Sequence, residues 1–178
     1  MVLSQTFLLI KAMSDIIINA FELCHRNEKR EGKVAIADLS RLSQICASNQ
    51  GTLTWRLAGS IGRLEHPQLH LEVAGKLELV CQRCMEPLIC EINSQTVIIL
   101  ARDDDAADEI EALLDDEDPT EVIVGEEKQD VLVLVEDEVL LSIPFSPMHE
   151  NCQEPSRKKS EEGFQSPFAV LGEWKRNK

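Results

Sequence analysis

The chain of 178 residues has no tyrosine and only five phenylalanines and two tryptophans. Proteins that bind single-stranded RNA without sequence preference usually stack the bases on several aromatic side chains. With so few aromatic residues, such a stacking platform is not expected. Apolar residues still make up 43% of the chain, which suffices for one domain with a hydrophobic core.

Long hydrophobic runs are also lacking. No stretch reaches the roughly 18 apolar residues that a transmembrane helix requires. The apolar run at residues 7–10 follows no basic region and precedes no small-residue cleavage site, so no secretory signal is predicted. We therefore expect a cytoplasmic protein with no membrane partner. Met13 begins Met-Ser-Asp, which has the form of a second start, so residues 1–12 are expected to be a disordered extension.

Basic residues are scarce, with 18 Lys and Arg against 32 Asp and Glu and a net charge of −14. Residues 101–138 hold 17 of these acids and two bases, so this segment alone contributes −15. The remaining 140 residues sum to +1. Because acidic side chains repel phosphate, contact with RNA is expected only away from residues 101–138, and DNA is not an expected partner.

Three segments are predicted strands: the first two alternate between apolar and polar residues, which is typical of half-buried strands, and the third has apolar residues at 88, 90 and 92 and then at 97–100. They lie at residues 53–61, 69–79 and 88–100, with turns at 62–67 and 81–87. We predict an antiparallel meander of three or more strands, with the second turn at its tip.

Helical spacing of apolar residues predicts a helix at residues 38–46, capped by Asp38, and another at 131–143, capped by Asp130 and ended by Pro144. The second segment contains β-branched residues that favour a strand locally, but its apolar stripe favours a helix. A short strand is predicted at residues 122–124. The predicted fold class is α+β, with the meander packed against a few short helices.

The acidic residues 101–119 are predicted to form a mobile loop that includes a short helix near residues 110–114. Their spacing is not that of a calcium loop, which favours a solvated acidic face. Glu136, Asp137 and Glu138 are likewise interpreted as mostly exposed charge, with a salt-bridged or partner-binding face as the alternative.

One domain is expected over residues 13–152, followed at residues 153–178 by a flexible linker and a docking tail. The tail combines basic side chains with a short apolar segment. Its predicted binding residues are Arg157, Lys158, Lys159, Phe168, Trp174, Lys175 and Arg176.

Six cysteines in a cytoplasmic chain are expected to be reduced, which directs attention to metal binding or burial. Cys81 and Cys84 have the C-x-x-C spacing that presents two sulfurs to one ion, and His149 and Cys152 form a second pair. Together they make a Cys₃His set suited to structural zinc. Two other interpretations stay open: no ligand at all, and redox chemistry, which the strand before Cys81 disfavours.

The other cysteines, Cys24, Cys46 and Cys90, have apolar neighbours at core spacing and are interpreted as small buried hydrophobes. The four histidines have no nearby serine elbow or carboxylate pair, and the glycines form no phosphate-binding loop. An enzyme is therefore not expected.

Three segments carry a resemblance to a known family: residues 77–84 leading through CQRC, VEDEVLLSIPFSPMHENC at 135–152, and PFAVLGEWKRNK at 167–178. Read together and in this order, they resemble the YceD family of large ribosomal RNA subunit accumulation proteins. The resemblance implies a non-catalytic role in the synthesis, processing or stability of 23S ribosomal RNA. It also implies ribosome assembly proteins or a precursor of the large subunit as partners.

Two alternatives come from the residues themselves. One is a thiol or metal-handling protein in which CQRC carries the chemistry. The other is an adaptor whose acidic segment binds a basic ribosomal protein.

Overall fold

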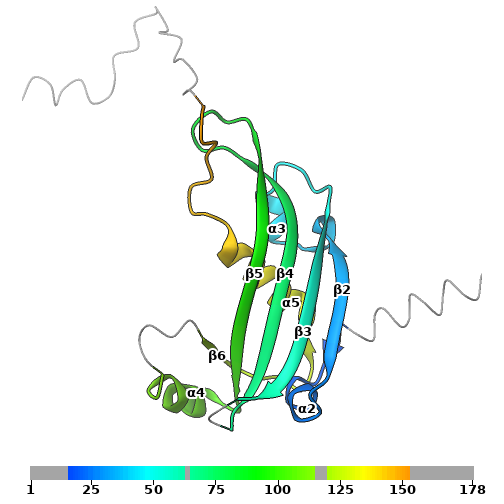
Figure 1. Cartoon of the computed structure of the whole chain (residues 1–178), viewed down its shortest axis with the longest axis vertical. Coiled ribbons are helices and arrows are strands. Elements are labelled where there is room, and N and C mark those ends of the chain that lie inside the picture. The colour runs from blue at the N-terminus through cyan, green and yellow to red at the C-terminus, as the bar shows by residue number, and fades with distance from the viewer. Residues whose placement is uncertain (1–15, 63–64, 115–119, 153–178) are drawn as a thin grey trace, which may run out of the picture.

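The computed structural model describes residues 16–62, 65–114 and 120–152. Its centre is a five-stranded sheet in the order β2-β3-β4-β5-β6, as Figure 1 shows. β2 to β5 are antiparallel neighbours, and β6 pairs parallel to β5. The predicted α+β class with an antiparallel meander is confirmed. The strands are β2 (Lys29–Ala35), β3 (Thr52–Ile61), β4 (Pro67–Val80), β5 (Pro87–Ala101) and β6 (Glu121–Val124).

β3, β4 and β5 confirm the three predicted strands; along β3 and most of β4 successive residues face the core and solvent in turn, whereas the last four residues of β5 are buried on both faces. β4 and β5 form a long hairpin in which Leu71 lies opposite Thr96 and Val80 lies opposite Pro87. The CQRC turn therefore lies at the tip of this hairpin, as predicted.

β2 was not predicted, because its sequence KREGKVA has little apolar alternation. Gly32 in β2 lies opposite Trp55 in β3. A Cβ atom at Gly32 would meet the Trp55 ring at 2.7 Å, so only glycine leaves room for the indole. The tryptophan thus covers the edge strand and ties it to the core.

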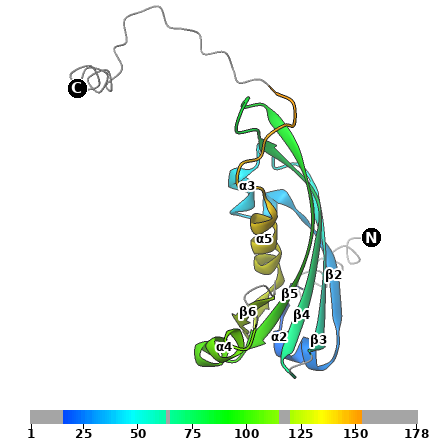
Figure 2. The ribbon, with the colours of Figure 1, turned by 60° about the vertical axis from the view of Figure 1, so that its left-hand side comes forward.

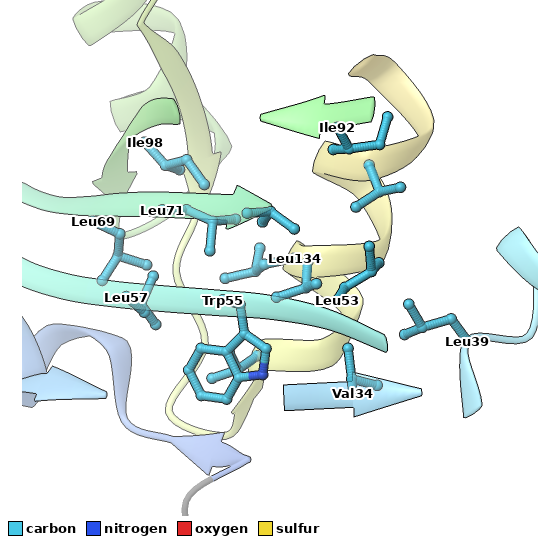
Figure 3. Close-up of a cluster of buried hydrophobic side chains, with 14 of the residues drawn as sticks. Val34, Leu39, Leu53, Trp55, Leu57, Leu69, Leu71, Ile92, Ile98 and Leu134 are labelled. Carbon is cyan, nitrogen blue, oxygen red and sulfur yellow. The ribbon is translucent and has the colours of Figure 1, made fainter. Parts of the chain in front are cut away.

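The predicted helix at residues 131–143 is confirmed as α5 (Val131–Ser142). Asp130 caps it by accepting a hydrogen bond from the Leu132 N–H at 2.8 Å. α5 lies along one face of the curved sheet (Figure 2). In Figure 3, Leu134 of α5 meets the inward leucines of β3 and β4, including Leu53 and Leu71, to form the main core.

Short elements close the remaining ends of the main core. α2 (Ala20–His25) begins at the Asn19 cap, and the two-residue strands β1 (Ile17–Ile18) and β7 (Gln129–Asp130) pair with each other. These three elements were not predicted, because they are too short to show a periodic pattern in the sequence.

The predicted helix at residues 38–46 is wrong in its extent. The structure has a 3₁₀ helix, η1 (Ile36–Asp38), and then a four-residue helix, α3 (Leu42–Ile45), with extended backbone at Leu39 between them. Asp38 lies in η1 and does not cap α3. The cap is Glu136 of α5, whose Oε1 accepts from the N–H groups of Arg41 and Leu42 at 2.7 and 3.0 Å.

The acidic segment also differs from the predicted loop, since residues 104–111 form the helix α4 (Asp104–Glu111). Asp103 caps α4 by accepting from the Ala106 N–H at 2.9 Å. Ile110 packs against Ile99 and Ala101 of β5, which alternate with the core-facing Ile98 and Leu100 and so point to the opposite face. This apolar contact stabilises a helix whose other side chains are mostly charged.

In the part of the chain that the structure describes, no helix has both the length and the apolar character needed to cross a lipid bilayer.

Candidate metal centre

The predicted ligand residues come from two separate elements that meet at the tip of the β4–β5 hairpin. Cys81 and Cys84 lie in the turn, where Met85 has the left-handed backbone (φ 64°) and donates its N–H to the Cys81 carbonyl at 3.0 Å. After α5 the chain runs back to this tip, and the Gln82 N–H donates to the Pro147 carbonyl at 2.9 Å. This contact brings residues 149–152 against the turn.

The four candidate ligand atoms of Cys81, Cys84, His149 and Cys152 all lie within 4.8 Å of one another. The Cys81 and Cys152 Sγ atoms are 3.8 Å apart, and the Cys84 Sγ lies 3.4 Å from the His149 Nδ1. Two sulfurs bound at about 2.3 Å to a tetrahedral zinc ion would lie about 3.8 Å apart, and a sulfur and an imidazole nitrogen about 3.5 Å apart. The spacing is therefore compatible with one tetrahedral ion.

The surroundings orient these ligands. The His149 Nε2 lies 3.1 Å from the Pro87 carbonyl, to which it donates when Nδ1 is left free for a metal. The His149 backbone N–H donates to the Cys81 Sγ at 3.4 Å, and Arg83 donates to the Cys152 carbonyl at 3.3 Å. Both sides of the cluster are thus held by hydrogen bonds outside the ligand set.

The thiols of the cluster differ in their ease of ionisation. Burial opposes the ionisation of Cys81, but N–H groups of Cys84, His149 and Arg83 outweigh it and lower the pKa of Cys81 to about 5. For Cys152, burial and the neighbouring Cys81 and Cys84 sulfurs raise the pKa. The lowered pKa favours the thiolate of Cys81, which is the form that binds a metal ion.

The remaining cysteines lie away from this cluster. Cys24 is buried and donates its S–H to the Gln68 carbonyl at 3.2 Å, while Cys46 and Cys90 are partly buried against the main core. Burial raises the pKa of all three thiols. Their interpretation as small core residues agrees with this placement.

The predicted exposure of residues 136–138 is wrong for two of the three carboxylates. Glu136 is 5% exposed and Glu138 is 9% exposed, whereas Asp137 is partly exposed. Besides capping α3, Glu136 accepts from the Arg41 Nε at 3.0 Å, and Glu138 accepts a hydrogen bond from the Ser94 hydroxyl. In the sequence, the burial of Glu136 is indicated only by its helical neighbours, since Leu132 and Leu140 lie one turn before and one turn after it.

The predicted binding residues Arg157, Lys158, Lys159, Phe168, Trp174, Lys175 and Arg176 lie outside the described residues, as do the predicted extension and tail.

A family model described as "Large ribosomal RNA subunit accumulation protein YceD" matches residues 69–173. The chain belongs to the YceD family. The match begins in β4 and includes both the C-x-x-C pair and the H-x-x-C pair. All four residues of the Cys₃His cluster therefore lie within the matched region. No curated protein and no solved structure matches the chain. The family description links YceD proteins to the accumulation of the large ribosomal RNA subunit.

Proposed function

We propose that the chain is a non-catalytic factor in the synthesis, processing or stability of 23S ribosomal RNA, and that it acts in the cytoplasm on assembling large subunits. Membership of the YceD family supports the ribosomal role. The observation that carries the non-catalytic part is the closed set of four ligand atoms at the hairpin tip. A zinc ion held by four protein ligands has no open position for a substrate or an activated water.

The role proposed for zinc is to join two elements that are distant in sequence. Cys81 and Cys84 belong to the hairpin, whereas His149 and Cys152 follow α5. With a zinc ion bound, residues 143–152 are fixed at the hairpin tip, and the free energy of metal binding adds to the stability of this end of the domain.

Thiol chemistry at CQRC is the competing function, and the low pKa of Cys81 favours it. Reactive cysteines, however, are partly exposed and often lie at the beginning of a helix. Cys81 is fully buried and follows a strand, so an oxidant has no direct approach to its sulfur. These two features support the structural role over the redox role.

The ribosomal role is tested by depleting the protein from growing cells and separating ribosomal subunits by sedimentation. We expect a deficit of large subunits and a fall in the ratio of 23S to 16S RNA, both restored by expression of the wild-type chain. If both ratios stay unchanged after depletion, the proposed function is wrong.

A second candidate, an adaptor for a basic ribosomal protein, is favoured by the exposed carboxylates of α4. Asp104, Asp105, Asp108 and Glu109 all lie on the solvent side of this helix. Such a cluster attracts a basic partner and repels RNA. The two functions are compatible, because an adaptor can promote RNA accumulation through a protein that itself binds RNA.

A further inference from the structure

Three large apolar side chains in α5 or just beyond it are exposed, and no described element covers them. Val133 is 46% exposed and Leu141 is 71% exposed, and they lie one turn to either side of Asp137, which pairs with Arg41. Phe145, just beyond the helix, is fully exposed. We call Val133, Leu141 and Phe145 the α5 stripe.

The sequence of α5 explains why this side needs cover. Its residues VLVLVEDEVLLS place apolar side chains on every side of the helix. Apart from Glu136, Asp137 and Glu138 the helix is almost entirely apolar, and such a helix is normally buried over most of its surface. The sheet buries only one side of α5, including Val131, Val135 and Val139.

We propose that residues 167–174 of the same chain dock on the α5 stripe. This segment, PFAVLGEW, holds most of the large apolar side chains in the 26 residues that follow Cys152. The family match reaches residue 173, so α5 and nearly all of this segment belong to one family unit. The inference does not depend on the role in ribosomal RNA accumulation.

Chain length favours this docking site over others. Residues 153–166 are 14 mostly polar residues, and a flexible chain of that length has an average span of about 20 Å. The connection starts at Cys152 on the hairpin tip. Six residues separate Leu141 from Pro147 at that same tip, so the stripe lies within about 21 Å of it.

The main alternative site within the chain is too distant for a relaxed connection. A cavity of about 370 Å³ between α2 and α4 is lined by Phe21, Leu100, Ile110 and Leu113. α2 and α4 lie at the opposite end of the sheet from the hairpin tip (Figure 1). β4 has 14 residues, so the separation is about 45 Å and requires an almost fully extended connection.

A second copy of the chain is also a poorer occupant. When a connection's average span matches the distance to its site, the effective concentration of the tethered segment is on the order of millimolar. Two separate chains at micromolar concentration do not compete with this value.

Trp174 provides the test, because the chain has only one other tryptophan, the buried Trp55. The difference between the fluorescence of the purified full chain and that of Trp174→Phe isolates the emission of Trp174. We expect this emission to be blue-shifted, and its quenching by acrylamide to be several-fold weaker than in urea. A Trp174 that is quenched as strongly in buffer as in urea overturns the proposal.

Two matched substitutions locate the docking site. Leu141→Lys changes the stripe at the end of α5, whereas Leu113→Lys changes a residue of the distant cavity that follows α4 and is equally exposed, at 70%. We expect Leu141→Lys to bring the quenching of Trp174 to its value in urea and Leu113→Lys to leave it unchanged. The opposite pattern would place the tail in the cavity and overturn the proposal.

Dilution separates the chain's own tail from that of a second copy. Docking within one chain predicts Trp174 quenching that is the same from micromolar to nanomolar protein. Quenching that strengthens on dilution would assign the site to another copy and contradict the proposal. Circular dichroism of each variant checks that the sheet remains folded.

Discussion

Glu136 is the buried carboxylate that joins α5 to α3. Its Oε1 accepts from two backbone N–H groups, and its Oε2 accepts from the Arg41 side chain. Asp137, the next residue, is bound to the same Arg41 at 2.6 Å but is about half exposed. The two acids therefore share Arg41 as a partner, but Glu136 is buried and also accepts from two backbone N–H groups.

Replacing Glu136 with Gln keeps the size of the side chain but removes its charge and turns one acceptor into a donor facing Arg41. We expect the free energy of unfolding to fall by about 1–3 kcal/mol, because buried hydrogen bonds to a charged group are lost. The control Asp137→Asn should cost less than about 1 kcal/mol, because its ion pair is exposed. Urea unfolding at neutral pH measures both, and equal losses would contradict the assigned role of Glu136.

The interaction of Glu136 with Arg41 and α3 should make the stability of the protein depend on pH. Burial alone would raise the pKa of Glu136, but hydrogen bonds from the Leu42 N–H and from Arg41 outweigh it and lower the pKa. A pKa lowered by folding stabilises the protein above the ordinary pKa of the acid, and this stabilisation is lost as pH falls through the folded value. The stability difference between wild type and Glu136→Gln should therefore be largest near neutral pH and shrink in acid.

Zinc binding should depend on the individual residues of the Cys₃His cluster. Purified wild-type chain should contain about one zinc ion per molecule, and Cys84→Ser should lose it, because serine is a poor zinc ligand. Cys90→Ser is the matched control, since Cys90 lies on the same hairpin outside the cluster. Elemental analysis with titration of accessible thiols measures both. A wild-type chain without zinc whose Cys81 and Cys84 oxidise rapidly and reversibly would favour the redox function instead.

The ligand residues could be predicted from the sequence, whereas the role of Glu136 could not. C-x-x-C and H-x-x-C each place two ligands together through local geometry, so spacing alone identifies the pairs. The burial of Glu136 depends on the N–H groups of α3, nearly a hundred residues earlier in the chain. No local pattern encodes a partner at that distance.

At the scale of elements, the segment after α5 depends on the metal centre more than the sheet does. In the described chain, residues 143–152 contact the hairpin through the Cys₃His cluster and a few hydrogen bonds, namely Gln82 to Pro147, Arg83 to Cys152 and His149 to Pro87. β4 and β5, by contrast, are paired along 13 positions and buried by α5. Loss of the ion should therefore loosen the hairpin tip and leave the sheet intact.

Hydrogen exchange of the zinc-loaded protein, with and without a chelator, tests this difference. The Gln82 amide should exchange faster once zinc is removed, because its acceptor Pro147 is no longer held. The Leu71 amide in the centre of β4 should keep its protection. Loss of protection at both positions would mean that the ion holds the whole fold.

The strands were easier to predict than the short elements for a physical reason. β3 and β4 bury one face against the same core, so their sequences alternate over most of their length, and β5 ends in an apolar run that is buried on both faces. β2 is covered by Trp55 of its neighbour, and α4 is stabilised mainly by Ile110. Both elements depend on contacts with other elements, and such contacts leave little periodicity in a short sequence.

At the scale of the whole molecule, charge is distributed unevenly over the surface. The sheet face opposite α5 carries Lys29, Lys33, Arg56 and Lys76 together with Glu31, Glu72, Glu78 and Glu91. On this face acids and bases balance one another in ion pairs, such as Arg56 with Glu72 at 3.0 Å and Lys76 with Glu91 at 2.6 Å. α4 instead carries exposed acids without a base within the helix.

This contrast predicts where a basic protein binds. Changing Asp104, Asp105, Asp108 and Glu109 to their amides removes four charges from α4 and keeps the Asp103 cap. We expect binding to salt-extracted large-subunit proteins to weaken by about 1–3 kcal/mol, roughly 5- to 150-fold, because each exposed pair contributes up to about 1 kcal/mol. The loss should diminish as salt is added.

A control with the same change in net charge separates position from overall charge. Glu31, Glu72, Glu78 and Glu91 changed to Gln remove four charges from the opposite sheet face. If the acidic helix itself is the binding site, this variant should bind basic ribosomal proteins nearly as well as wild type. Equal weakening in the two variants would show that only net charge matters. Binding of naked 23S RNA that the α4 variant leaves unchanged would place any RNA contact elsewhere on the chain.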